Sequence, residues 1–439
     1  MITVATLVGR NNILVTRAVQ QSLLAAREFG RRHNSEVYNS TISSRHFYQN
    51  EALLNFSSRA SRPISLKQFA FFGRKLTAEK IIQSANFVRQ ELPTRLAHRI
   101  HSMQVLPYSV VQNPHISRVY ELYYQSFDAL RKFPVIKTLE DNHRFCDLMH
   151  NMLTHHTTVI PHVIMGIIES ADLMDYKKLD EFVHLLLSSR ISRRVFTEQH
   201  IAMTDAFRKA PNSDISRDQV GQVFLQCNAT DVVHRCDDLA RKLVSSGHSH
   251  VELPALVLEG DVSTQFEFIE SHLRYMIGEI LRNAFEASVE RFEINGSEPK
   301  PLLVTICNAP QHVIFRFSDT AGGIPSEIMH DLWSFAKGPR SMTRLRNFAT
   351  VPALEAVIEE LEAAVDANLR NRMRVSSLAS LTTRSPDLRL GMGLPMSKVY
   401  AEFWGGRIAV NSLEGYGCDV VLHVSKLGVE SRFLEAAHL

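Results

Sequence analysis

Two polar residues lie one helical turn apart in the stretch GEILRNAFEAS, residues 278–288. Glu279 and Asn283 are spaced i and i+4, so a helix would place both on one face. An asparagine offers a neutral oxygen that suits Mg²⁺ beside phosphate, and a glutamate can orient or deprotonate a nucleophile. Because helices often produce this spacing by chance, the pair alone favours an ordinary solvated helix face.

Two motifs later in the chain make a functional role for this pair more plausible. Ser318 and Asp319 follow the apolar run HVIFRF, and Gly322 and Gly323 come three and four residues after Asp319. A carboxylate there can accept a hydrogen bond from an adenine amino group, while glycines let the backbone approach the base. Gly391 and Gly393 open a helical pattern in GMGLPMSKVYAE, where free N–H groups can bind a phosphate. Taken singly, the two motifs also fit a turn with a capping aspartate and a plain helix start.

Helical periodicity dominates the part of the chain that precedes these motifs. Apolar residues recur every three or four positions from about residue 60 to 215, which predicts an antiparallel helical bundle. Prolines are expected to separate its helices. They are Pro63, Pro93, Pro107, Pro114 and Pro134.

From about residue 225 the pattern mixes helices and strands. A helix is expected at 230–247, and strands are expected at 302–309, 312–319, 407–412 and 418–424. This interleaving predicts an α/β sandwich with a mixed sheet, so the fold class is α+β with an N-terminal helical bundle. The segment 338–387 contains a helical run that begins with acids and ends with arginines, and we interpret the segment as an inserted lid.

Composition limits the classes of protein to consider. The 439 residues are 45% hydrophobic and 22% charged, with a net charge of +3, so a broad nucleic-acid-binding surface is not expected. No apolar run reaches the roughly 18 residues that a membrane span needs. The five cysteines are scattered and form no CxxC pair, which indicates reduced thiols that are mostly buried.

The first 50 residues differ from the rest of the chain. They contain only two acids, Glu28 and Glu36, and many hydroxyl side chains. Their six arginines are Arg10, Arg17, Arg27, Arg31, Arg32 and Arg45. Together with an amphipathic basic run, this composition predicts a mitochondrial transit peptide over 1–50, with a helical or disordered arm as the alternative.

The order of the motifs is more informative than any one of them. A helix with E-x-x-x-N, a strand with D-x-x-G-G, an insert and a G-x-G helix start resemble the GHKL ATPase superfamily over about 260–425. RQELPTRLAHRIHSMQVLP, SSRISRRVFTEQH and GLPMSKVYAEFWGGRIAVNSLEGYGCDVVL resemble the mitochondrial kinases of 2-oxoacid dehydrogenase complexes over about 60–425. These are the pyruvate dehydrogenase kinases and the branched-chain ketoacid dehydrogenase kinase.

The resemblance implies a role for each residue of the motifs. Glu279 matches the general base that takes the proton of a substrate serine, and Asn283 matches the ligand of Mg²⁺. Asp319 matches the acceptor for adenine. The remaining matches to the nucleotide site are Glu286, Gly323, Gly391, Met392, Gly393 and Leu394. ATP and Mg²⁺ are the implied cofactors, with K⁺ as a further candidate.

Activity and partners follow from the same resemblance. It implies an ATP-dependent serine kinase of the mitochondrial matrix that inactivates the alpha subunit of the pyruvate dehydrogenase decarboxylase component. The branched-chain ketoacid dehydrogenase is the alternative substrate. The bundle at 60–215 would dock the lipoyl domain of the acyltransferase core, residues 225–427 would form the kinase domain, and the chain would form a homodimer.

Four positions depart from the family's pattern. Ala321 and Arg389 replace glycines, Cys418 replaces a threonine, and Tyr275 stands where pyruvate-type kinases usually carry histidine. A degenerate ATP-binding adaptor of the complex is therefore a second hypothesis.

A histidine in the bundle region gives a third hypothesis. His156 in HHTTVIP resembles the phosphoacceptor box of bacterial histidine kinases, because a neutral imidazole can attack phosphorus. The mitochondrial kinases carry a similar histidine and transfer to serine. We therefore expect a hydrogen-bonded structural histidine, with a phosphohistidine relay as the alternative.

Overall fold

The computed structural model describes residues 51–62, 76–209, 219–220, 223–248, 250–296, 298–337 and 391–426. Two compact units divide the chain, Met1–Ala52 and Leu53–Leu439, and the elements below belong to the second unit except where α3 begins. The expected transit peptide at 1–50 and the expected insert at 338–387 lie outside the described residues, so both stay predictions.

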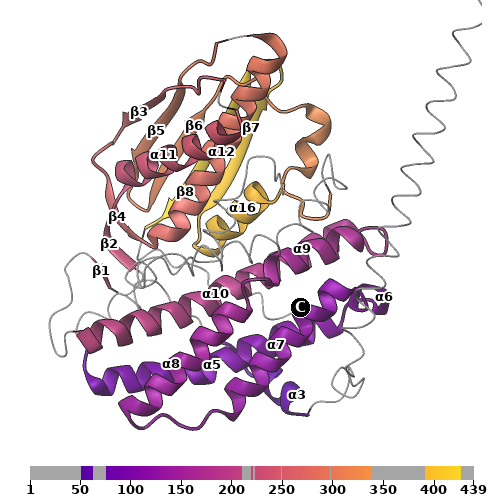
Figure 1. Ribbon diagram of the computed structural model, residues 1–439, viewed down its shortest axis with the longest axis vertical. Coiled ribbons are helices and arrows are strands. Elements are labelled where there is room, and N and C mark those ends of the chain that lie inside the picture. The colour runs from indigo at the N-terminus through magenta and orange to yellow at the C-terminus, as the bar shows by residue number, and fades with distance from the viewer. Residues whose placement is uncertain are drawn as a thin grey trace, which may run out of the picture. The chain divides into compact units, whose positions relative to one another are not determined.

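Helices make up most of the described residues up to 209 and form the expected bundle (Figure 1). They are α3 (Glu51–Ser57), α5 (Ala78–Gln104), α6 (Tyr108–Val111), α7 (Pro114–Lys132), α8 (Leu139–His155), α9 (Val159–Glu169) and α10 (Tyr176–Lys209). On α7, buried side chains such as Ile116, Tyr120, Tyr123 and Phe127 recur at three- and four-residue intervals and face the core. None of the described helices is both long and apolar enough to cross a membrane.

The prolines separate the helices with one exception. Pro107 caps α6, Pro114 is the first residue of α7, and Pro134 comes just after that helix ends. Pro93 does not end a helix, so that prediction is wrong. It lies inside α5, where burial of its neighbours against the bundle outweighs the missing N–H. Pro63 lies outside the described residues.

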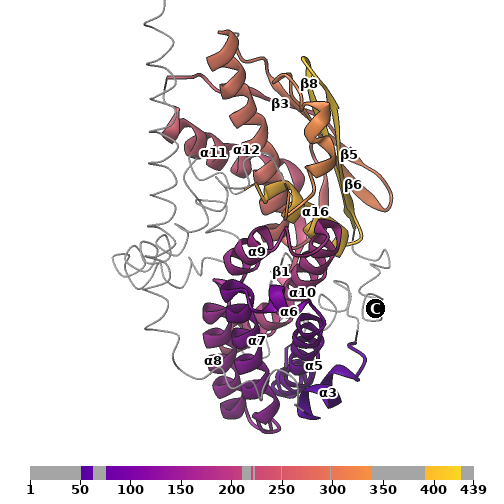
Figure 2. The ribbon, with the colours of Figure 1, turned by 90° about the vertical axis from the view of Figure 1, so that its right-hand side faces the viewer.

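A five-stranded mixed sheet forms the core of the C-terminal part (Figure 2). Its strands are β3 (Leu256–Gly260), β5 (Leu302–Asn308), β6 (His312–Ser318), β7 (Arg407–Leu413) and β8 (Gly417–Ser425), in the order β3-β5-β6-β8-β7. Only β3 and β5 pair in parallel. The four strands expected from the sequence are thus present, and the mixed α/β character is confirmed.

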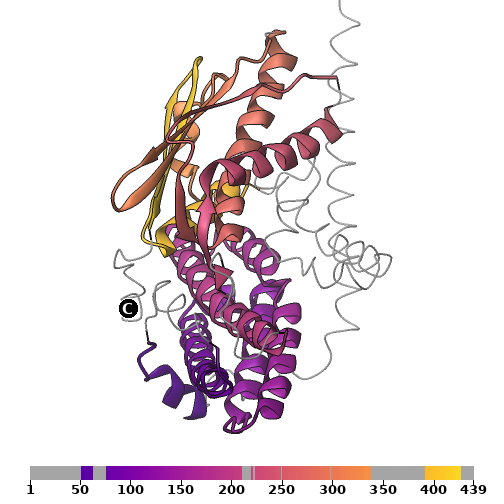
Figure 3. The ribbon, with the colours of Figure 1, turned by 90° about the vertical axis from the view of Figure 1, so that its left-hand side faces the viewer.

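Helices cover one face of this sheet (Figures 1 and 3). They are α11 (Ala229–Gly247), α12 (Glu270–Asn295) and α16 (Gly393–Phe403), and α12 packs against both α11 and α16. A smaller antiparallel sheet combines β1 (Gln219–Val220), β2 (Val223–Asn228) and β4 (Gln265–Phe268). The 3₁₀ helix η1 (Ser326–Asp331) follows the loop after β6.

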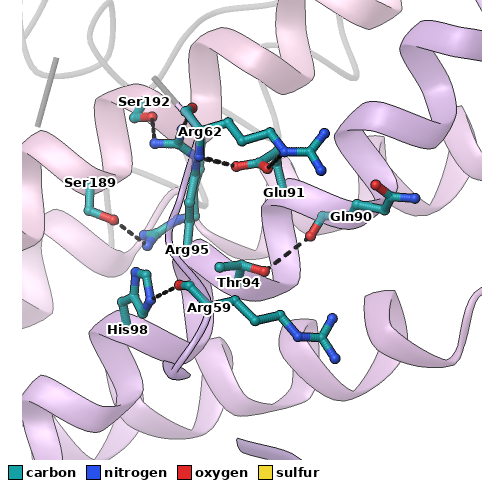
Figure 4. Close-up of polar contacts among 10 residues, drawn as sticks. Arg59, Arg62, Gln90, Glu91, Thr94, Arg95, His98, Ser189 and Ser192 are labelled. Carbon is teal, nitrogen blue, oxygen red and sulfur yellow. Dashed lines mark hydrogen bonds and ion pairs between the residues drawn. The ribbon is translucent and has the colours of Figure 1, made fainter. Parts of the chain in front are cut away.

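A buried ion pair joins α5 to α10 and to the chain before α5 (Figure 4). Glu91 and Arg95 are only 6% and 5% exposed and lie 3.6 Å apart, from Oε2 to Nε. Arg95 donates to the Ser192 hydroxyl at 2.7 Å and to the carbonyl of Arg62 at 2.6 Å. Glu91 accepts the N–H of Arg62 at 3.0 Å. The pair therefore fixes both backbone groups of Arg62 against the bundle.

Removing one partner of this pair is expected to destabilise the fold strongly. Arg95→Ala leaves the buried Glu91 carboxylate with only the largely exposed Arg62 guanidinium as a counter-charge, at 3.7 Å, and losing the buried partner costs about 3–5 kcal/mol of unfolding free energy. Lys132→Ala is the matched control, because Lys132 is 63% exposed beside Asp128 and such surface pairs contribute about 0–1 kcal/mol. Denaturant unfolding checks both variants, and equal small losses would contradict the assigned role.

Candidate nucleotide site

Glu279 and Asn283 do share one face of α12, as expected. Glu279 is fully buried, whereas Asn283 is exposed one turn later. Glu286 is half-buried and accepts a hydrogen bond from Nε of Arg282 at 2.7 Å. The helix thus carries an acid away from bulk water and an amide oxygen open to a ligand at its surface.

The glycine turn lies directly beside Glu279. A Cβ built on Gly393 would sit 2.1 Å from Oε2 of Glu279, so a larger residue at this position would force the Glu279 carboxylate to move. Gly391 has a φ of 62°, Met392 is the buried N-cap residue of α16, and Leu394 is half-buried in the first turn. The packing of α12 on α16 therefore brings the acid to a helix N-terminus, where N–H groups and the macrodipole favour a phosphate.

Asp319 lies at the end of β6 and is held by backbone donors. Its Oδ1 accepts the N–H of Ala321 at 2.9 Å and the N–H of Cys418 at 3.3 Å. Burial raises the pKa of Asp319, against the lowering effect of these bonds and of Arg291. A Cβ at Gly417 would meet the carbonyl oxygen of Asp319 at 2.0 Å, so β8 approaches this loop closely.

The two glycines after Asp319 adopt backbone conformations that other residues rarely adopt. Gly322 and Gly323 have φ values of 103° and 75°, in the left-handed region. A Cβ on Gly323 would meet the carbonyl oxygen of Leu413 at 2.3 Å, which ties the loop to the β7–β8 hairpin. Ala321 keeps its N–H bonded to Asp319, so the alanine is accommodated in the loop.

The other unusual positions have defined surroundings where the structure describes them. The Cys418 thiol donates to the Ser412 hydroxyl at 3.4 Å, and burial raises its pKa. Tyr275 is buried on α12, and Trp404 belongs to the core, with Nε1 donating to Nδ1 of His272 at 2.9 Å. Arg389 lies outside the described residues.

An arginine that the motifs do not mark connects the two halves of the site. Arg291 extends from α12 and donates to the carbonyls of Thr320 and Tyr416, the latter at 3.0 Å. The helix that carries Glu279 and Asn283 thereby also holds the loop of Asp319. No sequence pattern identifies Arg291, because an arginine near a helix end is usually solvated.

The donor set fits Mg²⁺ carried by a nucleotide better than a resident metal. Across the described residues there is no group of three or more His, Cys, Asp or Glu side chains that could hold a metal ion. Mg²⁺ commonly takes one or two protein oxygens and completes its shell with phosphates and water. The exposed amide of Asn283, one helical turn after the buried acid, can supply such an oxygen.

His156 is the buried, hydrogen-bonded histidine that we expected. Its Nε2 lies 2.8 Å from the Ser126 hydroxyl, and Arg190 donates to its carbonyl at 3.2 Å. Burial and the charges of Arg193 and Arg190 lower the pKa of His156 to about 3. Because the ring lies inside the bundle and is not exposed, it is poorly placed to accept a phosphate.

The cysteines are reduced thiols. All five are free, and Cys146, Cys227 and Cys236 are buried, whereas Cys307 is exposed and Cys418 is partly buried. The expectation that most of them are small buried side chains holds for the first three.

Both halves of the chain match known protein families. Residues 63–224 match the family described as mitochondrial branched-chain alpha-ketoacid dehydrogenase kinase. Residues 269–427 match the histidine kinase-, DNA gyrase B- and HSP90-like ATPases. A helical bundle followed by this ATPase fold defines a class of ATP-dependent protein kinases.

Individual relatives narrow the class. The chain is 34% identical to pyruvate dehydrogenase (acetyl-transferring) kinase 2, mitochondrial, of Saccharomyces cerevisiae, over 90% of this chain and 88% of that protein. It is 28% identical to the corresponding kinase of Arabidopsis thaliana, over 83% and 90% of the two chains. Isozyme 1 of Homo sapiens is also 28% identical, over 93% and 87%. The chain belongs to the mitochondrial pyruvate dehydrogenase kinase family.

Proposed function

We propose that the chain is a protein serine kinase of the mitochondrial matrix that uses ATP and Mg²⁺. It phosphorylates the alpha subunit of the pyruvate dehydrogenase decarboxylase component and thereby inactivates it. The observation that carries the proposal is the contact of buried Glu279 with Gly393 at the start of α16. This contact puts a candidate base beside a candidate phosphate turn, which is the arrangement that transfer to a hydroxyl needs.

Each residue of the site then has a chemical task. Glu279 accepts the serine proton as the serine oxygen bonds to the γ-phosphorus and the bond to ADP breaks. The N–H groups around Gly391, Met392, Gly393 and Leu394 bind phosphate oxygens. Bound Mg²⁺ neutralises phosphate charge, with Asn283 as its protein ligand. Asp319 accepts from the adenine amino group.

Further proposals concern the rest of the assembly. We assign the kinase domain to 225–427, in which Glu286 and Gly323 complete the nucleotide site, with K⁺ as a possible further ion there. We assign docking of the lipoyl domain to the bundle at 60–215, and we propose a homodimer. The transit peptide proposed for 1–50 agrees with the mitochondrial names of the relatives.

The branched-chain ketoacid dehydrogenase is a second candidate substrate, because the family matched by residues 63–224 is described by that activity. The relatives named above favour pyruvate dehydrogenase. The two substrates are separable by experiment, since both complexes can be purified and offered to the same kinase.

Phosphate transfer to the two purified complexes tests the proposal. With Mg-ATP, the chain is expected to label the alpha subunit of the pyruvate complex at least about 10-fold faster than that of the branched-chain complex, a difference of about 1.4 kcal/mol in transition-state binding. The reverse ratio would assign the branched-chain substrate. ATP binding without transfer to either complex would leave the adaptor hypothesis. An acid-labile, base-stable label on His156 would support the relay.

A further inference from the structure

One carboxylate of the bundle binds the backbone that follows the Asp319 loop and η1. Oδ1 of Asp180, near the start of α10, accepts the N–H groups of Phe335 at 2.8 Å and Ala336 at 3.0 Å. Oδ2 accepts the hydroxyl of Ser334 at 2.6 Å. Hydrogen bonds to an ionised carboxylate are about twice as strong as those between neutral groups. A single side chain thus bonds to three consecutive residues of a distant segment.

The segment that Asp180 binds, Ser334–Ala336, is buried and makes further hydrogen bonds. Ser334, Phe335 and Ala336 are all buried, although no helix or strand contains them. The Ser334 hydroxyl also accepts the N–H of Lys337 at 2.9 Å, and its backbone N–H donates to the carbonyl of Asp331 at 3.0 Å. Because the segment pairs with no described strand, the three bonds to Asp180 add to this burial in fixing where it lies.

The same face of α10 also contacts α16, the helix that begins at the glycine turn. Tyr176, Asp180 and His184 follow one another at i+4 spacing, so they share a face. The ammonium of Lys337 lies 3.9 Å from the centre of the Tyr176 ring. Nε2 of His184 lies 3.6 Å from Oε2 of Glu402 on α16, and α10 packs along that helix (Figure 1).

Two helices, α12 and α10, each contact both α16 and the chain in or after the Asp319 loop. Along α12, Glu279 contacts Gly393, and Arg291 holds the loop of Asp319. Along α10, Asp180 holds the segment after that loop, and His184 contacts the far end of α16. ATP must span from the adenine acceptor to the phosphate turn, so its affinity depends on the spacing that these two helices set.

We propose that Asp180 is a positioning residue for the nucleotide. It does not touch ATP but acts through Ser334–Ala336, keeping the Asp319 loop and the start of α16 at the spacing that the bound nucleotide requires. This inference rests on the proposed function, because it assumes that ATP binds between those two elements. The bundle residue Asp180 would thereby contribute to the affinity of a site built from other elements.

Nucleotide affinity and turnover, measured separately, test the assignment. Asp180→Ala in the full chain is expected to raise the Kd for Mg-ATP, measured by titration calorimetry, about 10-fold, while kcat at saturating ATP stays within about threefold. Asp180→Asn should restore most of the affinity, because its side-chain oxygen still accepts both N–H groups. Ser334→Ala removes one of the three bonds and should raise Kd by about two- to fourfold.

Two controls separate positioning from general structure. Asp172→Ala removes an exposed carboxylate just before α10 and should leave Kd unchanged. The Ser334→Ala effect should shrink in an Asp180→Ala background, since contacting residues are not additive. Unchanged affinity in Asp180→Ala, or a fall in affinity and kcat together that Asp180→Asn does not rescue, would overturn the assignment. If Asp180→Ala does not fold, a Ser334→Ala protein with wild-type affinity overturns it equally.

The outcomes also separate this inference from the proposed function. A wild-type chain that binds Mg-ATP but phosphorylates no complex refutes the kinase proposal. The Kd values of wild type and the Asp180 variants can still be compared in that case. A wild-type chain that transfers phosphate to the alpha subunit, with an Asp180→Ala variant of equal affinity, refutes the positioning role alone.

Discussion

Glu279→Gln is expected to lower kcat for phosphate transfer by about 10²–10⁴-fold, the usual contribution of a general base. Glutamine has the same shape as glutamate, so it fits the buried position against Gly393. It cannot accept the serine proton as the phosphorus–oxygen bond forms. The Kd for Mg-ATP should stay within about threefold, because the exchange alters the transition state more than nucleotide binding.

The matched control for this variant lies on the same helix. Glu293 is 42% exposed at the end of α12, where it contacts His248. Glu293→Gln should leave both kcat and Kd unchanged, because exposed pairs contribute little. If Glu279→Gln instead lost ATP binding while keeping its rate at saturating ATP, the acid would be a binding residue and the assigned role would be wrong.

Asp319→Ala is expected to raise the Kd for Mg-ATP by about 100-fold, close to 3 kcal/mol. The exchange removes the proposed adenine acceptor and also leaves the N–H groups of Ala321 and Cys418 without their side-chain partner. Both losses act on the same loop. Calorimetric titration with Mg-ATP, and with Mg-GTP for comparison, measures the effect and the loss of preference for adenine.

A neighbouring carboxylate provides the control for that prediction. Asp419 is the next residue on β8 after Cys418 and bonds Arg316 at 2.6 Å and the Ser318 hydroxyl. Asp419→Asn should change the Kd for Mg-ATP by less than about twofold, because a partly exposed pair contributes little. Equal losses in both variants would point to damage of the sheet edge and would contradict a specific role of Asp319 in adenine recognition.

The local parts of the site were predictable from the sequence. The spacing of Glu279 and Asn283 fixes their common face on any helix, and the order of the glycine motifs after that helix indicates a nucleotide site. Strands with alternating β-branched and aromatic residues, such as 302–308 and 312–318, were also recognisable. In each case the signal lies within one element.

The contacts between elements were not predictable in the same way. The approach of Gly393 to Glu279 depends on how α16 packs against α12, and no single window of sequence contains both. Arg291 and Asp180 look like ordinary charged residues of amphipathic helices, yet each binds the backbone of a distant segment. Their roles follow from the tertiary fold.

Two features of the fold were not predicted from the sequence for other reasons. Pro93 reads as a helix break, but the bundle buries the residues around it and α5 continues. The strands β1, β2, β3 and β4 were not anticipated. They contain between two and six residues each, so their alternation is too short to separate from a loop.

The most direct test of the account is a single-turnover transfer from Mg-ATP, bound in advance to the full chain, to the purified alpha subunit of pyruvate dehydrogenase. Wild type and Glu279→Gln are run in parallel at equal nucleotide occupancy. The account predicts an acid-stable serine phosphate from wild type and transfer at least about 100-fold slower from the variant. Equal labelling by the two proteins, or no labelling by wild type with ATP bound, would contradict it.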